Sequence, residues 1–333
     1  MWDEGWGKRQ TTTGDVTEFP QRVRAIAPAS IGNLGPGLDV LGCAVTGAGD
    51  AVLAEWCDAP GIVVRDPGHP ELPTDPALHA SAIAASAVLR QALGGGVRPP
   101  AAGIALTVRK ELPLSAGQGG SAASAVAGAV AANALCGSPL PVEALLDACL
   151  VAESTVAGRH LDNLAPSLLG GICLVRSMDP IDVVRLSVPE GLYLVLAHPA
   201  QRLRTAEARA VLPALVDRAT ALHQAAQVGA IVAALASGDL ALLGRAIDDR
   251  IAEPARAPLI PGFREAKAAA LTAGALGASI SGAGPTTFAL AGDLACARAV
   301  AVAMEAAFAS QAITSSVRVC EVDRVGARVE VTP

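Results

Sequence analysis

The stretch PLSAGQGGSAAS, residues 113–124, joins a predicted strand to a predicted helix. Apolar and polar residues alternate from Ile104 to Arg109, which indicates a half-buried strand before the stretch. From Ser121 to Cys136 the residues are mostly small and apolar, which predicts a helix after it. Glycines let a backbone approach a ligand closely, and the first N–H groups of a helix lack internal partners and attract anions. The stretch therefore predicts a phosphate-binding loop that needs no lysine.

Two other nucleotide-binding motifs fit this stretch less well. Gly117, Gly119 and Ala122 match the G-x-G-x-x-A pattern of dinucleotide-binding folds. Those folds need a second strand that ends in an acidic residue about 20 positions later, whereas residues 138–143 (SPLPVE) predict the start of another helix. A GxxxxGK[ST] loop needs its lysine inside the glycine loop. None of the three lysines lies there: Lys8, Lys110 and Lys267.

Two further segments are rich in glycine: PASIGNLGPGLDVLG at 28–42 and GASISGAGPTT at 277–287. Each alone is as well explained by a tight turn as by a ligand-binding loop. Three such segments in a chain of enzyme size favour ligand binding. In the third segment we expect the turn with Gly282 and Gly284 to pack against the site, although a simple hairpin turn also explains it.

The remaining pattern mixes strands and helices without regular βαβ alternation. Strands are expected at 22–27, 40–45, 51–56, 61–65, 104–108, 171–176, 182–186, 192–196, 277–281, 286–291, 317–322 and 327–331. Helices are expected from Asp75-Pro76 to about 93, at 121–136, from Pro141, and at about 206–226, 228–237, 239–251, 262–273 and 293–309. We therefore expect an α+β fold in two domains, residues 21–180 and 181–333, after a flexible tail over residues 1–20.

The composition is that of a globular protein with a net negative charge. Of the 333 residues, 52% are hydrophobic and 17% are charged, which excludes disorder as the bulk state. The formal net charge of −6 gives no electrostatic footprint for nucleic acid or for an anionic membrane. We therefore expect neither of them as a partner.

Cysteine usage and hydropathy indicate a cytoplasmic location. The seven cysteines include no C-x-x-C pair and their number is odd, which argues against a zinc site or a secreted disulfide framework. The uncharged run at 112–142 contains prolines, and its apolar part is too short for a spanning helix. The opening residues, MWDEGWGKRQ, lack the apolar region of a signal peptide. We expect a soluble, cytoplasmic protein.

The three glycine-rich segments, in their order and spacing, resemble the three motifs of the GHMP kinases, a superfamily of small-molecule kinases. Four stretches, the first of them inside the first glycine-rich segment, are similar to the homoserine kinase family within it: NLGPGLD at 33–39, HLDNLAP at 160–166, TAEARAVLP at 205–213 and EPARAPLIPG at 253–262. The matched motifs span about residues 22–292, which is most of the chain.

This resemblance implies both a fold and a reaction. The fold would pair an N-terminal domain like ribosomal protein S5 domain 2 with a ferredoxin-like C-terminal domain, usually in a homodimer. The reaction would transfer the γ-phosphoryl group of ATP, with Mg²⁺, to the hydroxyl of L-homoserine, giving O-phospho-L-homoserine for threonine biosynthesis. The ATP loop would consist of Pro113, Leu114, Ser115, Ala116, Gly117, Gln118, Gly119, Gly120, Ser121 and Ala122.

The resemblance also implies which residues bind the amino-acid substrate. Arg209 and Arg256 would hold its carboxylate, which suits a guanidinium fork, and Asp39 would face its ammonium. Further contacts would come from Asn33, Asp162, His160 and Thr205. Apart from the family pattern, such residues are also explained as surface arginines, a turn cap, a buried histidine and a helix N-cap.

For catalysis the resemblance implies a site without a strong general base, because phosphoryl transfer depends mostly on positioning and charge stabilisation. Asn163 would orient the substrate hydroxyl, and Asp162 is the nearer carboxylate if a base exists. Mg²⁺ would bind Glu153 and a loop serine, Ser121. The pattern departs at Gly120, which stands where the family commonly has its metal-binding serine.

Two alternatives remain beside this hypothesis. A GHMP kinase for another small alcohol would be expected to lack the Arg209 and Arg256 pair, which is present here. A catalytically dead member that senses ATP or an amino acid is favoured by Gly120 alone, and Asn163 and Glu153 argue against it.

Overall fold

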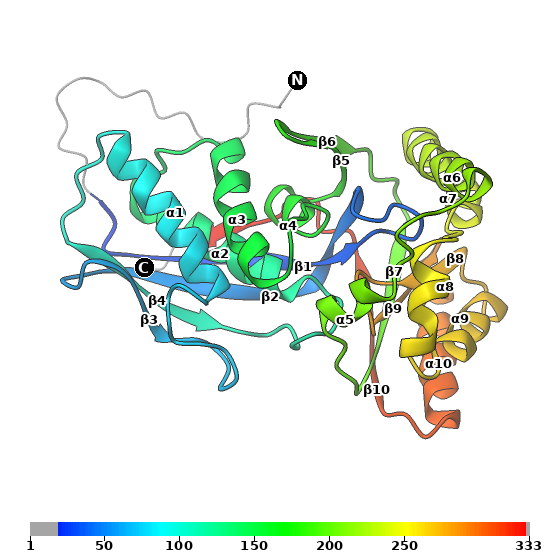
Figure 1. Cartoon of the computed structure of the whole chain (residues 1–333). Helices are drawn as coiled ribbons and strands as arrows, with labels where there is room; N and C mark the ends of the chain where they lie inside the picture. The colour runs from blue at the N-terminus through cyan, green and yellow to red at the C-terminus, as the bar shows by residue number, and fades with distance from the viewer. Residues whose placement is uncertain (1–18, 331–333) are drawn as a thin grey trace.

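The structure of the chain is a computed structural model in which residues 19–330 are described (Figure 1). Residues 1–18 of the expected tail lie outside the described residues, as does the end of the strand expected at 327–331. The described elements form two β-sheets, each packed against helices, which confirms the expected α+β class.

Among residues 19–330 the first sheet has seven strands. They are β1 (Arg22–Gly32), β2 (Leu41–Cys57), β3 (Gly61–Asp66), β4 (Gly103–Arg109), β5 (Ile172–Met178), β6 (Ile181–Leu186) and β11 (Arg328–Glu330). The order is β11-β1-β2-β4-β3, and β5 pairs with the start of β2 and with β6. The strands expected at 40–45 and 51–56 are one strand, β2, because β1 pairs with it on both sides of an irregularity after Pro28.

Four helices cover one face of this sheet (Figure 1). They are α1 (Ala80–Gly94), α2 (Gly120–Leu135), α3 (Val142–Val156) and α4 (Leu164–Leu169). Helix α2 is apolar on all sides and nearly all of its residues are buried, as expected of a helix at the centre of a core. Helix α4 was not predicted, because six residues that include a proline carry too short a periodic pattern.

Helix α1 begins later than the Asp75-Pro76 start that the sequence predicted. The first helical residue is Ala80, and His79 is its N-cap. Asp75 instead closes a turn, in which its Oδ1 accepts from Ala77 N at 2.9 Å and its carbonyl oxygen accepts from Leu78 N at 3.0 Å. The turn leaves residues 72–79 as a loop beside the cavity described below.

The second sheet is antiparallel and has the order β10-β7-β9-β8. Its strands are β7 (Tyr193–Pro199), β8 (Gly277–Ile280), β9 (Thr287–Ala291) and β10 (Ser315–Glu321). Helices α9 (Phe263–Thr272) and α10 (Leu294–Ser310) pack against it through a core that includes Val300, Met304 and Phe308. A four-stranded antiparallel sheet with helices packed against it agrees with the ferredoxin-like expectation.

The helices between β7 and α9 differ from those predicted. They are α5 (Thr205–Ala210), α6 (Arg218–Ser237), α7 (Leu240–Arg245), α8 (Ala252–Arg256) and a 3₁₀ turn (Ala257–Leu259). The helix expected at 206–226 is wrong, because the chain breaks near Pro213 and α6 starts at a new cap, where Asp217 Oδ1 accepts from Thr220 N at 2.8 Å. The helix expected at 239–251 ends at Arg245.

Helix α6 is the one described helix with the length and mean hydropathy, 1.3, to cross a membrane, which by itself is weak evidence for a span. Its Gln224, Ile231, Ala234 and Leu235 are buried against the rest of the protein.

The strands of the first sheet continue past residue 180, where the sequence predicted the division between domains. Strand β6 pairs with β5, so the first sheet continues to Leu186 and the second begins at Tyr193. The chain then returns to the first sheet, where β11 pairs with β1. By hydrogen bonding, residues 181–186 and 328–330 therefore belong with the N-terminal part rather than with the C-terminal part.

Candidate active site

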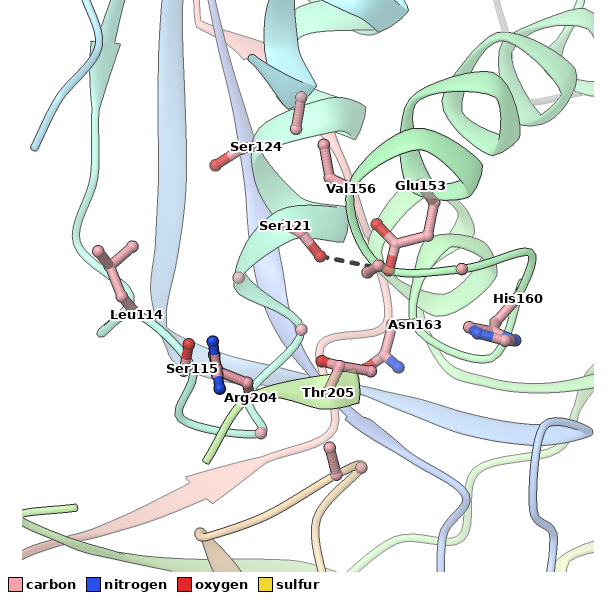
Figure 2. A pocket seen from close by; sticks show the side chains of 18 of the residues that line it. Leu114, Ser115, Ser121, Ser124, Glu153, Val156, His160, Asn163, Arg204 and Thr205 are labelled. Atoms are coloured by element: carbon pink, nitrogen blue, oxygen red, sulfur yellow. Dashed lines mark hydrogen bonds between the residues drawn. The ribbon is translucent and has the colours of Figure 1, made fainter. Parts of the chain in front are cut away.

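A cavity of about 710 Å³ lies where the three glycine-rich segments converge. Its walls come from the loop after β1 and from the segments seen in Figure 2: the loop between β4 and α2, the end of α3, and the residues before α4. Helices α5 and α8 and the turn between β8 and β9 close the remaining side. Two sheets and both halves of the chain thus contribute to one cavity.

The glycine loop before α2 directs its carbonyl oxygens toward other segments. The carbonyl oxygens of residues 115–118 accept, in order, from Leu203 N (3.1 Å), Thr286 N (3.2 Å), Ser281 Oγ (2.6 Å) and Ser30 N (3.2 Å). Ser30 belongs to the first glycine-rich segment, and Ser281 and Thr286 belong to the third. These bonds hold the loop in place before α2, and the first N–H groups of that helix, which lack partners within the helix, can bind an anion.

Most of the predicted phosphate loop lines the cavity: Pro113, Leu114, Ser115, Ala116, Gly117, Gly119, Gly120 and Ser121. Gln118 and Ala122 do not. The Gln118 side chain reaches toward the second sheet, where its Nε2 donates to Thr286 Oγ1 at 3.3 Å and its Oε1 accepts from Arg318 at 3.0 Å. Ala122 is fully buried within the helix packing. The side chains of these two residues therefore do not form part of the cavity wall.

Ser121 and Glu153 face each other from α2 and α3 (Figure 2). Ser121 Oγ donates to Glu153 Oε1 at 3.2 Å, and Glu153 Oε2 is buried without a hydrogen-bond partner among the described residues. Burial raises the pKa of Glu153 to about 7. A hydroxyl and a carboxylate that lacks a balancing cation are oxygen ligands of the kind Mg²⁺ prefers. The pair therefore fits a divalent cation, whose other ligands would be phosphate and water oxygens.

Lys110 lies next to Gly120, the position at which the sequence departs from the family pattern. A Cβ atom at position 120 would lie 2.9 Å from Lys110 Nζ, and this ammonium also donates to the Gly120 carbonyl oxygen at 2.7 Å. The ammonium thus occupies the space that a serine side chain at 120 would need, while Ser121 is the residue that reaches Glu153.

Lys110 also belongs to a buried ion pair that sequence reasoning missed. Its ammonium pairs with Asp50 and donates to Ser124 Oγ at 3.1 Å, and the Lys110 and Asp50 side chains are 4% and 0% exposed. Asp50 accepts from Ser124 Oγ at 2.6 Å and from the N–H groups of Glu111 and Leu112 at 3.1 Å. The network therefore joins β2, the entry to the glycine loop and α2. The available signal was a rare lysine directly before the loop.

Asp39, Arg209 and His160 contact one another although they come from separate segments. Arg209 Nη2 donates to Asp39 Oδ1 at 2.6 Å, and Nη1 donates to Oδ2 at 3.3 Å. Arg209 Nη2 also lies 3.1 Å from His160 Nδ1. Burial lowers the pKa of His160, so the imidazole is neutral at pH 7 and its Nδ1 accepts from the guanidinium.

Arg256 ends α8 and is 2% exposed. Its Nη1 donates to the Gly282 carbonyl oxygen at 2.8 Å, and its Nε donates to the Ala208 carbonyl oxygen at 3.2 Å. Asn33 Nδ2 donates to the same Gly282 oxygen at 3.0 Å. The turn of the third glycine-rich segment thus packs against the site, as expected, and orients two side chains from different segments.

Asp162 and Asn163 lie beside the glycine loop, just before α4. Asp162 is 3% exposed and its Oδ2 accepts from Asn33 N at 3.2 Å. Burial, with the nearby Asp39 carboxylate, raises the pKa of Asp162 to about 6. Ser30 Oγ donates to Asn163 Oδ1 at 2.9 Å, and a hydrogen bond from the Asn163 side chain to the Asp162 carboxyl opposes the rise in the pKa of Asp162. A side chain at Gly32 would overlap both residues, so this close approach requires glycine.

Thr205 lines the cavity as the first residue of α5. The N-cap of this helix is Arg204, whose backbone N–H and guanidinium both donate to Glu207, so the alternative explanation of Thr205 as an N-cap is wrong.

One end of the cavity is apolar and was not predicted. It is lined by Leu72, Pro73, Leu78, Ala80 and Val156, from the loop before α1, the start of α1 and the end of α3. Apolar walls of this kind suit the flat ring of a nucleobase. Their sequence carries no motif, so the signal for them is weak.

Four polar side-chain atoms of cavity-lining residues are buried without a hydrogen-bond partner in the described part of the chain. They are His79 Nδ1, Glu153 Oε2, His160 Nε2 and Arg209 Nε. An unpaired buried polar group costs about 1–3 kcal/mol. A ligand bound in this cavity would give these atoms partners.

Comparison with known proteins points to one superfamily. Residues 80–171 match the model of the GHMP kinases N terminal domain, and residues 231–310 match that of the GHMP kinases C terminal domain.

Relatives that match over nearly the full length of the chain identify one family within this superfamily. The chain is 40% identical to a homoserine kinase of Chloroherpeton thalassium, with 93% of this chain and 99% of that protein covered. It is also 40% identical to a homoserine kinase of Arabidopsis thaliana, with 92% and 84% covered. The crystal structure of homoserine kinase from Cytophaga hutchinsonii superposes with a TM-score of 0.89 at 40% identity, covering 96% of this chain and 100% of that one.

Proposed function

The chain belongs to the homoserine kinases of the GHMP kinase superfamily, and from that membership we propose how its own residues carry out the reaction. The reaction is transfer of the γ-phosphoryl group of ATP to the hydroxyl of L-homoserine. The observation that carries the substrate assignment is one carboxylate, Asp39, and two guanidiniums, Arg209 and Arg256, in the wall of the cavity that also holds the glycine loop. They complement a small zwitterion beside a phosphate site.

When homoserine binds, its two charged groups would take the place of ionic contacts that the protein makes within itself. The substrate carboxylate would accept from Arg209 and Arg256, and its ammonium would donate to Asp39. Asp39 and Arg209 are paired with each other at 2.6 Å, so a substrate with both charges replaces both halves of that pair. His160 Nε2, which is buried without a partner among the described residues, is available for a further contact.

ATP would place its phosphates at the glycine loop and the start of α2, with its base in the apolar end of the cavity. The carbonyl oxygens of residues 115–118 are bonded elsewhere, which supports this placement. Ser121 and Glu153 would hold Mg²⁺. When bound, the cation neutralises charge on the phosphates.

Asn163 would orient the attacking hydroxyl, with its amide held by Ser30. An amide cannot take a proton at neutral pH. The hydroxyl proton therefore passes to the transferred phosphate or to Asp162, whose pKa of about 6 leaves it mostly ionised at pH 7. Positioning and charge stabilisation, rather than a strong base, then lower the barrier.

The function is tested by ADP release with Mg-ATP and L-homoserine, beside L-serine, L-threonine, mevalonate and no acceptor. Turnover with L-homoserine alone is expected. Turnover with another alcohol would contradict the substrate, and no turnover by a protein that still binds ATP would favour the sensor hypothesis.

The raised pKa of Glu153 predicts a pH-dependent affinity for Mg-ATP. A cation binds the ionised carboxylate, so below pH 7 it must displace a proton. We expect the apparent affinity to fall by up to about tenfold per pH unit between pH 7 and pH 5. Calorimetric titration at several pH values measures this.

Glu153→Gln, which does not titrate, is the matched control for the proton uptake of ATP itself. The same pH slope in both proteins would contradict a role for Glu153. Without a cation, ionisation of Glu153 destabilises the fold, because its pKa is higher in the folded chain than in the unfolded one. The wild-type free energy of unfolding should therefore fall relative to Glu153→Gln as the pH rises from about 4.5 to above 7.

We also propose a cytoplasmic homodimer. The family resemblance supports the dimer, and the exposed Leu215 and Leu222 offer apolar surface for a second copy. The seven cysteines are free thiols, which suits a reducing compartment.

A further inference from the structure

Gln224 of α6 is a buried, non-titrating side chain outside the cavity wall. It is 8% exposed, and its carboxamide makes three hydrogen bonds. All three bonds go to two segments that also contain a residue proposed to bind the substrate, Asp39 in one segment and Arg256 in the other.

The first of these segments is the loop at residues 33–39. Gln224 Nε2 donates to the Pro36 carbonyl oxygen at 3.0 Å, three residues before Asp39. Asn33, Leu34 and Asp39 all have positive φ angles, 67°, 44° and 61°, which residues other than glycine rarely adopt. A backbone of this kind persists only when its surroundings fix it, and the bond to Pro36 is one such restraint.

The second segment is the turn that starts α8. Gln224 Oε1 accepts from Arg250 N at 2.9 Å, and its Nε2 donates to Asp249 Oδ1 at 3.0 Å. Asp249 in turn accepts from the N–H groups of residues 251–253 at 2.8–3.1 Å and so caps α8, which ends at Arg256.

We propose that Gln224 is a positioning residue that fixes the separation between the ammonium-binding and carboxylate-binding sides of the substrate pocket. One carboxamide spans the Asp39 loop and the cap of the Arg256 helix. The ammonium and the carboxylate of the substrate are bonded to the same carbon atom. The two sides of the pocket must therefore keep a fixed spacing for one substrate molecule to contact both. The inference rests on the proposed roles of Asp39 and Arg256.

Gln224→Met tests it, because methionine keeps the length and burial of the side chain and removes all three hydrogen bonds. The KM for L-homoserine should rise about tenfold or more, while the KM for ATP stays within about twofold. Gln227→Met is the matched control. It makes the same change three residues along α6, at a partly buried position, and should leave both constants unchanged.

If Gln224 only stabilises the fold, Gln224→Met would lower the melting temperature without raising the KM for L-homoserine more than the KM for ATP. That outcome would overturn the proposal. Equal rises in both KM values would overturn it too. If Gln224→Met does not fold, Gln224→Asn keeps the amide but is one methylene shorter, and it should raise the homoserine KM by a smaller factor. Wild type and Gln227→Met report on the function itself. Their failure to phosphorylate L-homoserine would refute the proposed function, separately from the role of Gln224.

Discussion

Replacing Arg209 by alanine should lower kcat/KM for L-homoserine by about 30- to 1,000-fold and leave the KM for ATP within about twofold. The guanidinium makes two hydrogen bonds to Asp39 and, by proposal, holds the substrate carboxylate. Truncating one partner of a hydrogen-bonded charge pair in a pocket costs about 2–4 kcal/mol, part of it from the carboxylates left unpaired. Steady-state kinetics with each substrate varied in turn measures both constants.

Arg218→Ala removes an exposed cation at the start of α6 and is the matched control. A second test uses 3-amino-1-propanol, which is homoserine without its carboxylate, as the phosphoryl acceptor. If Arg209 binds that carboxylate, Arg209→Ala should change turnover of this analogue far less than turnover of homoserine. Equal losses for both acceptors, or equal losses of homoserine and ATP affinity in a folded protein, would refute the assignment.

Lys110→Met should lower the free energy of unfolding by about 3–5 kcal/mol, because it leaves Asp50 charged and without its cation. Both side chains are almost completely buried, so little water reaches Asp50 to replace the lost partner. Urea unfolding followed by circular dichroism measures the change. Affinity for ATP should also fall, because the network holds the entry to the glycine loop.

The double variant Asp50→Asn, Lys110→Met should recover part of the lost stability, since the amide oxygen still accepts from Glu111 N and Leu112 N while the buried charge is gone. Arg65→Met is the control. Arg65 pairs with Glu55 at 2.7 Å on the surface and should contribute about 0–1 kcal/mol. A loss at Lys110 no larger than the loss at Arg65 would contradict the role given to the buried pair.

The residues carried by motifs could be predicted because each motif fixes its own backbone and chemistry. The residues proposed to bind substrate or to act in catalysis, taken from the stretches at 33–39, 160–166, 205–213 and 253–262, all line one cavity. The Asp50–Lys110 pair could not be predicted in this way. It depends on the register of β2 against β4, which sets Ala51 opposite Arg109, and one sequence does not reveal that register.

The errors in the helices have a local cause. The alanine- and leucine-rich run at 206–237 has strong helix propensity, and that propensity was extended across Pro213. Pro213 and the cap at Asp217 were the signals that two helices stand there. The break matters for the site, because it lets α5 present Arg209 to the cavity while α6 turns Gln224 toward the loop at 33–39.

The return of β11 to the first sheet has a consequence for how the protein is made. Arg24 of β1 pairs with Glu330, 306 residues later, and β11 is the last described strand of the chain. On the ribosome, β1 therefore acquires this outer neighbour only after the 306 residues from Arg24 to Glu330 have been added to the chain. Long-range closure of this kind slows folding. Until it occurs, the hydrogen-bonding edge of β1 stays open to other chains, so β11 also protects β1 from edge-to-edge aggregation.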